Sequence, residues 1–471
     1  MLQTLKNAWK IPELKSKILF TLMIVILYRL GSNLPMPWVD PHALESMFNV
    51  GGSALSWWNT LSGGALAQAT LFALSVSPYI TASIVIQLLT VAIPKFENWA
   101  KEGESGKKKL SAITRALTVV LALVTSVGYT MYMGSAGALT AISWDDKLHG
   151  SEVFAFIVLV LTYCAGASVI MWLAEKINEH GIGNGISIIL FANIIAGLPS
   201  MAGGIITRCF ATETELLMKG YANGLGTLFA DVANGRVWQI VVGVVVCILF
   251  AAILLLAVVV VVWFSNSERR IPVQYAKRVV GRKMYGGQST TLPLKLDMAG
   301  VMPVIFASSI ASILPTIAGF IPSTAKGFWG GFKNVIENYL GHTSFPYIAV
   351  QLLLIVAFAY FYIMISFNPV EVSNNLRNNG GVIPGIRPGK PTVDYIKKIL
   401  NRITLMGAIF LCGLSGIPMI VNAIWYAIDG QGIADLAFSG TSLLIVVGVA
   451  LETFRELEAQ MTLRNYKGFL D

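Results

Sequence analysis

Few residues of this sequence could do chemistry on a small molecule. The stretch Gly-Glu-Ser-Gly-Lys at 103–107 has the glycines and lysine of a phosphate-binding loop, but its spacing does not fit GxxxxGK[ST] and no predicted strand precedes it. No Ser/His/Asp or H-E-x-x-H constellation occurs. The histidines lie on separate loops without metal-ligand spacing, at His42, His149, His180 and His342. We therefore predict a protein that is not an enzyme and uses no cofactor or metal.

Basic side chains are concentrated in two segments, 267–297 and 368–402. Such segments can contact anionic lipid, worth about 1 kcal/mol per basic residue near the surface. Lipid recognition needs no fixed shape, however, and Arg387 lies between Pro384-Gly385 and Pro388-Gly389, which would hold it rigidly. Anionic lipid and a docked protein both remain possible partners.

Membrane helices are the elements that must position these segments. The chain has 471 residues, of which 55% are hydrophobic and 13% charged, outside the range of soluble domains. A spanning helix needs about 20 predominantly apolar residues. We predict a single membrane domain, 1–471, with ten spans at 18–36, 74–94, 114–134, 153–173, 186–203, 238–263, 298–318, 347–367, 403–423 and 438–455.

The distribution of Lys and Arg predicts the orientation. With both termini in the cytoplasm, the inside segments hold 27 of the 34 basic residues, whereas 33–75 contains none. The net charge of +9 is therefore mainly a topology signal.

The interiors of the predicted spans lack Asp, Glu and His, and ionisable residues occur only near span ends, at Arg29, Arg115 and Glu452. A small-solute secondary transporter usually places such a group near mid-membrane, so this alternative is disfavoured but stays open. All three ionisable residues can snorkel to the membrane interface or pair, and we expect a structural role for Arg29, since a lone arginine near a helix end usually reaches the interface.

The segment 54–74 is too polar and glycine-rich to span, yet too apolar for an ordinary exposed loop. It either re-enters the membrane, buried in protein, or forms an interfacial helix with Trp57 and Trp58 at the headgroups.

At this point the sequence resembles the SecY family of bacterial protein translocons. The matching motifs occur in family order along almost the whole chain: Ser62-Gly63-Gly64-Ala65, Pro78-Tyr79-Ile80-Thr81-Ala82-Ser83, Gly181-Ile182-Gly183-Asn184-Gly185, Arg269-Arg270-Ile271, Pro384-Gly385-Ile386-Arg387-Pro388-Gly389 and Gly440-Thr441-Ser442-Leu443-Leu444-Ile445.

The resemblance implies an all-α membrane protein whose ten transmembrane helices form two pseudo-symmetric five-helix halves, 1–203 and 238–471, with an extracytoplasmic loop, 204–237, between them. Inverted halves of this kind occur in other transport proteins. A re-entrant plug segment would cover about 57–72, with Ser62, Gly63, Gly64 and Ala65.

The resemblance also implies a function: a protein-conducting channel subunit that passes unfolded secretory polypeptides across the bacterial plasma (inner) membrane and releases transmembrane segments laterally into lipid. Spans two and three would face spans seven and eight as a lateral gate, with Gln87, Ser308 and Ser309 as its polar contacts, although such residues more often join packed helices. The expected pore ring is Val76, Ile80, Ile186, Leu190, Ile305 and Ile445.

Family position assigns docking of the SecA ATPase or the ribosome to Arg270, Arg282, Lys283 and Arg387. The other partners implied are SecE-like and SecG-like small membrane subunits, polypeptides that carry signal sequences, and anionic lipids.

Overall fold

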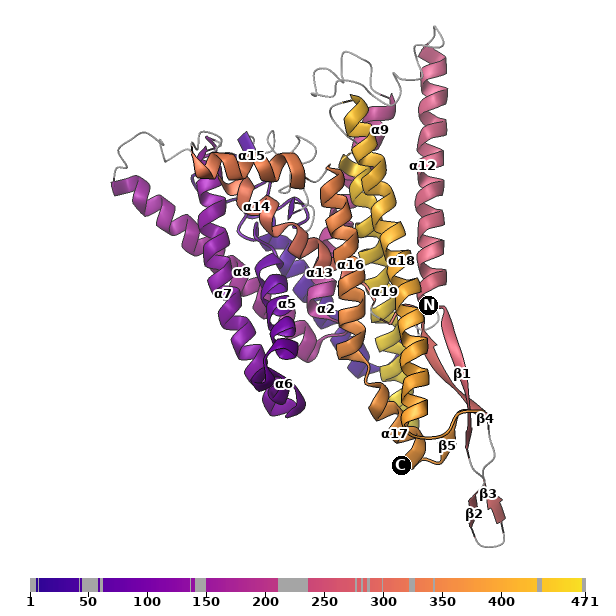
Figure 1. The fold of residues 1–471 in the computed structure, drawn as a ribbon. Coiled ribbons are helices and arrows are strands. Elements are labelled where there is room, and N and C mark those ends of the chain that lie inside the picture. The colour runs from indigo at the N-terminus through magenta and orange to yellow at the C-terminus, as the bar shows by residue number, and fades with distance from the viewer. Residues whose placement is uncertain are drawn as a thin grey trace.

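The computed structural model describes residues 6–467 except 7, 42, 45–57, 60–61, 136, 140–149, 211–235, 276–277, 281–282, 286–288, 299, 322–326, 342–343 and 430–433. Within this part the molecule is a bundle of long, roughly parallel helices, with a small β-structure projecting from one end (Figure 1). The predicted loop 204–237 falls largely outside the described residues.

The helices are described in two groups, those that begin before residue 204 and those that begin after it, and the pseudo-symmetry of two such halves remains a prediction. The first contains α2 (Pro12–Gly31), α5 (Ser77–Ala92), α6 (Pro94–Lys101), α7 (Glu104–Ser135), α8 (Gly150–His180) and α9 (Gly185–Phe210). The second contains α12 (Arg236–Ser265), α13 (Met302–Ala311), α14 (Ile313–Phe320), α15 (Phe328–Leu340), α16 (Phe345–Ser366), α17 (Pro369–Asn378), α18 (Lys390–Asp429) and α19 (Ala434–Lys467).

Each of the ten predicted ranges overlaps a helix, but length and composition support fewer spans. In the described part, six helices are long and apolar enough to cross a membrane, or seven if α5 and α6 form one bent span. These two helices meet at 101°. The residue before a proline is biased toward extended backbone, and Ile93, before Pro94, has φ −117° and ψ 118°. The molecule is thus a multi-pass helical membrane protein, and the count of ten remains a prediction.

The basic segments contain strands, so the prediction of an all-α fold is wrong there. Strands β1 (Glu268–Tyr275) and β4 (Ser289–Lys295) pair antiparallel, with Ile271 opposite Leu292. Strand β5 (Gly381–Val382) joins the other edge of β1 to give the order β4-β1-β5, called the basic sheet below. A separate hairpin is formed by β2 (Arg278–Val280) and β3 (Lys283–Tyr285).

The physical reason for these strands is alternation. Ile271 and Val273 are buried, while Arg270, Pro272 and Gln274 between and beside them are exposed, which is the two-residue period of a half-buried strand. The buried face packs on Leu376 and on three residues of α18, Ile396, Leu400 and Ile403.

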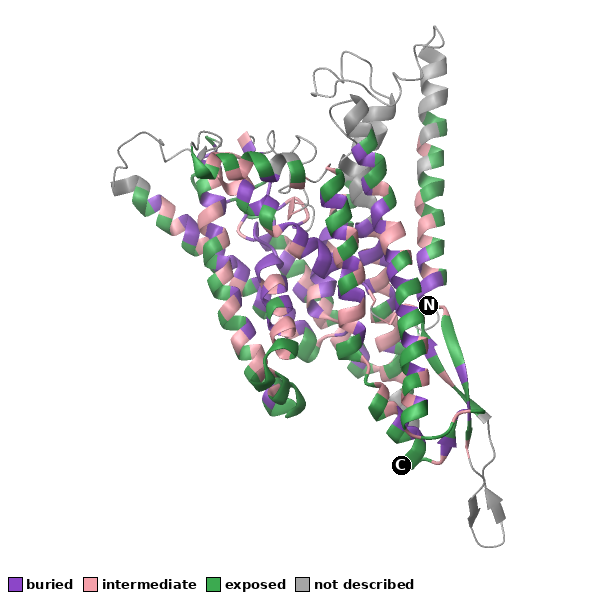
Figure 2. Cartoon of the chain, in the orientation of Figure 1, coloured by how far each residue is buried: buried purple, intermediate pink, exposed green. Residues whose placement is uncertain are grey.

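The main core lies in the middle of the bundle, where buried residues gather in Figure 2. It unites side chains of α2, α5, α8, α9, α13, α16, α18 and α19, and therefore of both halves. Contacts between the halves occur where α13 packs on α5, α14 on α7, and α9 on α12 and α19.

Candidate functional site

The six predicted pore residues come together in one apolar cluster. Val76, Leu190 and Ile445 are each 1% exposed, Ile80 and Ile305 are also buried, and Ile186 packs partly buried against them. They come from α5 and the turn before it, from α9, from α13 and from α19. These six residues are called the aliphatic ring. Aliphatic side chains offer no fixed hydrogen-bonding groups, and a constriction made of them can close by dewetting.

Residues 62–76 form a series of mostly buried turns enclosed by helices, called the turn segment below. Six of its residues contribute to a second apolar cluster with α7 and α8: Leu66, Ala67, Ala69, Leu71, Ala73 and Leu74. Its backbone is held by two tyrosines: the Tyr129 hydroxyl donates to the Leu66 carbonyl at 2.5 Å, and the Tyr163 hydroxyl to the Ala69 carbonyl at 3.3 Å. Non-helical backbone of this kind survives at membrane depth only inside protein or beside a cavity.

The four predicted plug residues all lie in the turn segment. Ser62 and Ala65 are buried, and the Ser62 hydroxyl accepts the Leu66 N–H at 3.1 Å. Gly63 and Gly64 have φ of +68° and +89°, in the region that favours glycine. Of the predicted plug, Trp57, Thr60 and Leu61 lie outside the described residues.

Arg29 binds backbone carbonyls beside this segment, and pairing was one of the two alternatives expected for it. Its Nη2 donates to the carbonyl oxygens of Ala192 at 2.6 Å and Asn193 at 3.1 Å. A Cβ placed on Gly63 would lie 2.9 Å from the same Nη2. The guanidinium therefore joins α2 to α9 where the turn segment begins. No local pattern indicates this contact, because the carbonyl acceptors are 163 and 164 residues away in sequence.

The predicted gate residues lie on helices that touch. Ser308 and Ser309 are buried on α13, and Gln87 is half-buried on α5, which α13 contacts. Ser308 donates to its own helix, at the Val304 carbonyl (2.9 Å), and Gln87 donates to Ser83 at 3.5 Å. Hydrogen bonds across the gate by these residues remain a prediction. The eighth predicted span, α16, packs against α13, α15 and α18.

The basic sheet joins the two predicted docking loops, because β5 comes from 368–402 and β1 from 267–297. Arg270 is exposed and its Nε donates to Glu268 at 2.7 Å. Arg387 lies in a loop with φ of +79° at Gly385 and +102° at Gly389, and its carbonyl accepts the Thr392 hydroxyl at 2.9 Å. Arg282 lies outside the described residues, and β3 begins at Lys283.

A polar junction at the base of the sheet was not predicted. Arg455 Nη2 donates to the Ser265 carbonyl at 2.5 Å, and the Ser265 hydroxyl donates to Asp297 Oδ2 at 3.3 Å. Burial raises the pKa of the Asp297 carboxyl above its ordinary range, although the hydrogen bonds from Ser265 and Gly300 and the charges of Arg455 and Lys295 oppose this shift. The sequence offered one signal of this junction, namely the carboxylate of Asp297 directly before the predicted span 298–318.

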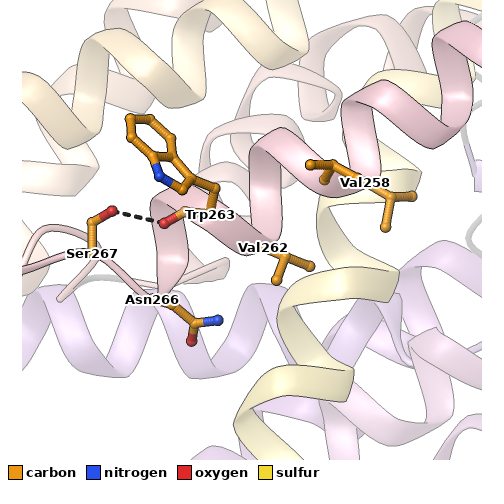
Figure 3. Close-up of a pocket in the computed structure, with 6 residues that line it drawn as sticks. Val258, Val262, Trp263, Asn266 and Ser267 are labelled. Carbon is orange, nitrogen blue, oxygen red and sulfur yellow. Dashed lines mark hydrogen bonds between the residues drawn. The ribbon is translucent and has the colours of Figure 1, made fainter.

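A shallow apolar pocket lies on the outer face of α12, formed by two turns of the helix and the residues after it (Figure 3). It is lined by Val258, Val259, Val262, Trp263, Asn266 and Ser267. Trp263 is 71% exposed, whereas Val258 and Val262 pack against a cluster with α19, so the pocket lies at the edge of the contact between α12 and α19. It is separate from the aliphatic ring.

Comparison with known sequences gives relatives that match over the whole chain. The profile of the SecY family matches residues 70–454. The protein translocase subunit SecY of Streptomyces scabiei is 41% identical over 475 residues, and that of Streptomyces galbus is 42% identical over 478, with 100% of both chains covered in each case.

Solved channel structures share the fold. The structure of a protein conducting channel aligns with a TM-score of 0.57 at 17% identity, covering 97% of this chain and 96% of the other. A SecY protein whose plug domain stabilises the closed channel and maintains a membrane seal aligns at 0.56 and 16% identity, with the same coverage. Sec61 in the canine ribosome-channel complex aligns at 0.54 and 15% identity, again covering 97% and 96%. The matched profile and these full-length relatives establish that the chain belongs to the SecY family.

Proposed function

We propose that this chain is the pore-forming subunit of a protein-conducting channel that passes unfolded secretory polypeptides across the bacterial plasma membrane and releases apolar segments sideways into lipid. One observation carries the proposal. Aliphatic residues of both halves converge in the aliphatic ring, and a buried non-helical segment reaches the same cluster through Phe72 and Val76. The family is non-enzymatic, in keeping with the expectation from the sequence.

The aliphatic ring suits this function because a polypeptide carries every side-chain type. A constriction with fixed donors or acceptors would retain polar segments, whereas aliphatic side chains wet when a chain enters and dewet when it leaves. The ring draws Ile80 and Leu190 from the first half and Ile305 and Ile445 from the second. Separation of the halves would therefore widen it. Nothing favours the alternative of a small-solute secondary transporter.

The turn segment serves as the plug in this proposal. Its hydrogen bonds to Tyr129 and Tyr163 attach it to α7 and α8, on one side of the pore. The turn segment can move out of the pore without the unfolding of a helix. A related SecY protein has a plug domain that maintains the membrane seal.

The lateral gate runs where α13 and α14 of one half meet α5 and α7 of the other. The small side chains of Ser308 and Ser309 let the gate helices pack closely, and separating these helices costs little free energy. Transmembrane segments and signal sequences would leave the pore along this seam.

The docking surface for SecA or the ribosome consists of the basic sheet, the segment of the β2–β3 hairpin and the loop after β5, with Arg270, Arg282, Lys283 and Arg387 as contacts. A related channel is found in a ribosome complex. A SecE-like or SecG-like membrane subunit fits the apolar faces exposed to the bilayer, α12 among them, and both chain ends lie in the cytoplasm. The ends pack together, since Ala8 and Leu14 contact Leu457.

The substitution Ile445→Asn tests the pore. It puts a hydratable amide into the aliphatic ring, and we expect substrates with defective signal sequences to pass. Val447→Asn is the matched control, because Val447 is buried on the same helix but faces α12 in a different cluster. An unpartnered buried amide costs about 1–3 kcal/mol at either position.

Abundance and signal-sequence discrimination are measured together in each strain. Relaxed discrimination with Ile445→Asn alone supports the pore. Normal discrimination at normal abundance, or equal relaxation by both variants, removes Ile445 from the ring.

A further inference from the structure

The end of α12, the turn before α13 and a residue within α19 meet at the base of the basic sheet. Ser265 is the last residue of α12, and its carbonyl accepts Arg455 Nη2 at 2.5 Å. The same nitrogen donates to Asn266 Oδ1 at 2.9 Å. Arg455 lies on α19, 190 residues away in sequence from Ser265. One guanidinium thus ties α19 to the end of α12.

The link continues through a carboxylate to α13. Asp297 accepts the Ser265 hydroxyl at 3.3 Å and also the backbone N–H of Gly300. Gly300 has φ of +59° and precedes α13 by two residues. Asp297 therefore fixes the turn through which β4 enters α13. We call Arg455, Ser265 and Asp297 the junction.

Both long strands of the basic sheet leave from this junction. Glu268, at the start of β1, pairs with Lys295 at the end of β4, and the Leu296 N–H donates to the Ser267 carbonyl at 2.9 Å. A load on β1 or β4 reaches α12 and α13 through these few residues, while the buried face of the sheet also rests on α18.

The junction leads directly to the pore. Ile305 lies eight residues beyond Asp297, on α13, and Ile445 lies ten residues before Arg455 on α19, about 15 Å along a helix. Both belong to the aliphatic ring, and α13 also carries the predicted gate residues. A shift of the junction therefore moves two helices that line the ring.

A purely structural role explains part of this geometry. The last carbonyls of a helix need donors, and a cation is favourable near its C-terminus, so Arg455 caps α12 well. The hydrogen bond from Gly300 to Asp297 likewise shapes the turn before α13. Neither role requires that α12, α19 and the turn before α13 be joined by one chain of contacts, and this connection carries the inference.

We propose that Arg455 is a positioning residue that, through Ser265 and Asp297, transmits movement of the basic sheet to α13 and α19 and so opens the aliphatic ring. This inference rests on the proposed channel function, in which the motor docks on the sheet. The junction thereby couples docking of the motor on the basic sheet to opening of the aliphatic ring.

The test uses the complete channel in proteoliposomes with SecA, ATP and a secretory preprotein. Arg455→Gln removes the cation and keeps a shorter polar side chain, and we expect translocation to fall about tenfold, as loss of a hydrogen bond to a charged group implies. SecA affinity should stay within about twofold, because a charge that lies outside the docking contact and is screened by water contributes little to binding. ATP consumed per translocated chain should rise. Arg455→Lys, which keeps a cationic donor, should restore most of the rate.

Lys107→Gln is the control for loss of a cation, because Lys107 is exposed on α7 and lies outside both basic segments. If Arg455→Gln fails to assemble, Asp297→Asn replaces it, since the amide keeps an acceptor and removes the buried charge. The expected result is again reduced translocation with normal SecA affinity.

Unchanged translocation in the assembled variant overturns the inference, and so does a parallel loss of SecA affinity and translocation. Failure of the wild-type channel to translocate would instead count against the proposed function. If Arg455→Gln lowered the melting temperature but left the amount of ATP used per translocated chain normal, Arg455 would have only the structural role of a helix cap, and the inference would be wrong.

Discussion

Gly63→Ala should loosen the turn segment more than Gly64→Ala, although both substitutions place a Cβ on a residue with positive φ. Gly63 has φ of +68° and Gly64 of +89°. A Cβ on Gly63 would lie 2.9 Å from Arg29 Nη2 and 3.0 Å from the Asn193 carbonyl oxygen. A Cβ on Gly64 would meet nothing within 4 Å. Gly64→Ala is therefore the control for backbone strain alone.

The magnitude follows from these surroundings. Left-handed backbone costs a residue with a Cβ about 1–2 kcal/mol, and this strain is common to both variants. Only Gly63→Ala also displaces Arg29 from its bonds to Ala192 and Asn193. Hydrogen bonds to charged groups contribute about 1.5–3 kcal/mol each, so partial loss adds roughly 1.4 kcal/mol. These costs apply only while the turn segment is in its closed position. The difference of roughly 1.4 kcal/mol should therefore make the open fraction about tenfold higher in Gly63→Ala than in Gly64→Ala.

Ion conductance of the resting channel in planar bilayers measures this fraction directly. Translocation of a preprotein with a defective signal sequence gives an independent reading. Equal conductance of the two variants, at equal abundance, would refute the argument that Arg29 and the Asn193 carbonyl hold the turn segment in place.

Two further predictions concern the basic side of the molecule. Arg387→Glu should stop SecA-driven export into vesicles while changing the free energy of unfolding by less than about 0.5 kcal/mol, because the side chain is exposed. Lys107→Glu, an exposed charge reversal on α7 outside both basic segments, should export normally. Normal export by Arg387→Glu would exclude the docking role. Since the pKa of Asp297 is raised on folding, the folded state binds more protons than the unfolded state between the ordinary and the raised pKa, and stability from this group falls as pH rises through that window. The melting temperature of Asp297→Asn should therefore match or exceed that of wild type at neutral pH. As the pH is lowered toward the ordinary carboxyl range, the melting temperature of wild type should rise relative to that of the variant. The neighbouring charges of Lys295 and Arg455 are present in both proteins.

The apolar pattern predicted the positions of helices well because a long apolar run in lipid has few alternatives. The aliphatic ring needed the resemblance, since Val76, Ile80 and Leu190 look like ordinary packing residues by spacing alone. The structure brings all six ring residues into one cluster. Their role in the pore stays a prediction, as do the polar contacts of Gln87.

Interactions between distant segments escaped prediction. Nothing near Arg29 in the sequence indicates that it binds carbonyls of α9, and nothing near Ser265 indicates Arg455. The strands were missed for a different reason. Alternation of Ile271 and Val273 with exposed neighbours is a legible signal, but a search for apolar runs long enough to span the membrane passes over it.

The pairing of β5 with β1 also has a consequence for biogenesis. Strands β1 and β4 are close in sequence and can pair as soon as both have been synthesised. Strand β5 pairs at Val382 with Gln274, and α13 and α16 lie between them in the chain. The third strand can therefore join only after α16 has been made, and such long-range pairings form late. A half-synthesised channel lacks the finished surface that carries Arg387. If this surface docks a motor as proposed, the order of synthesis delays that docking until most of the pore is present.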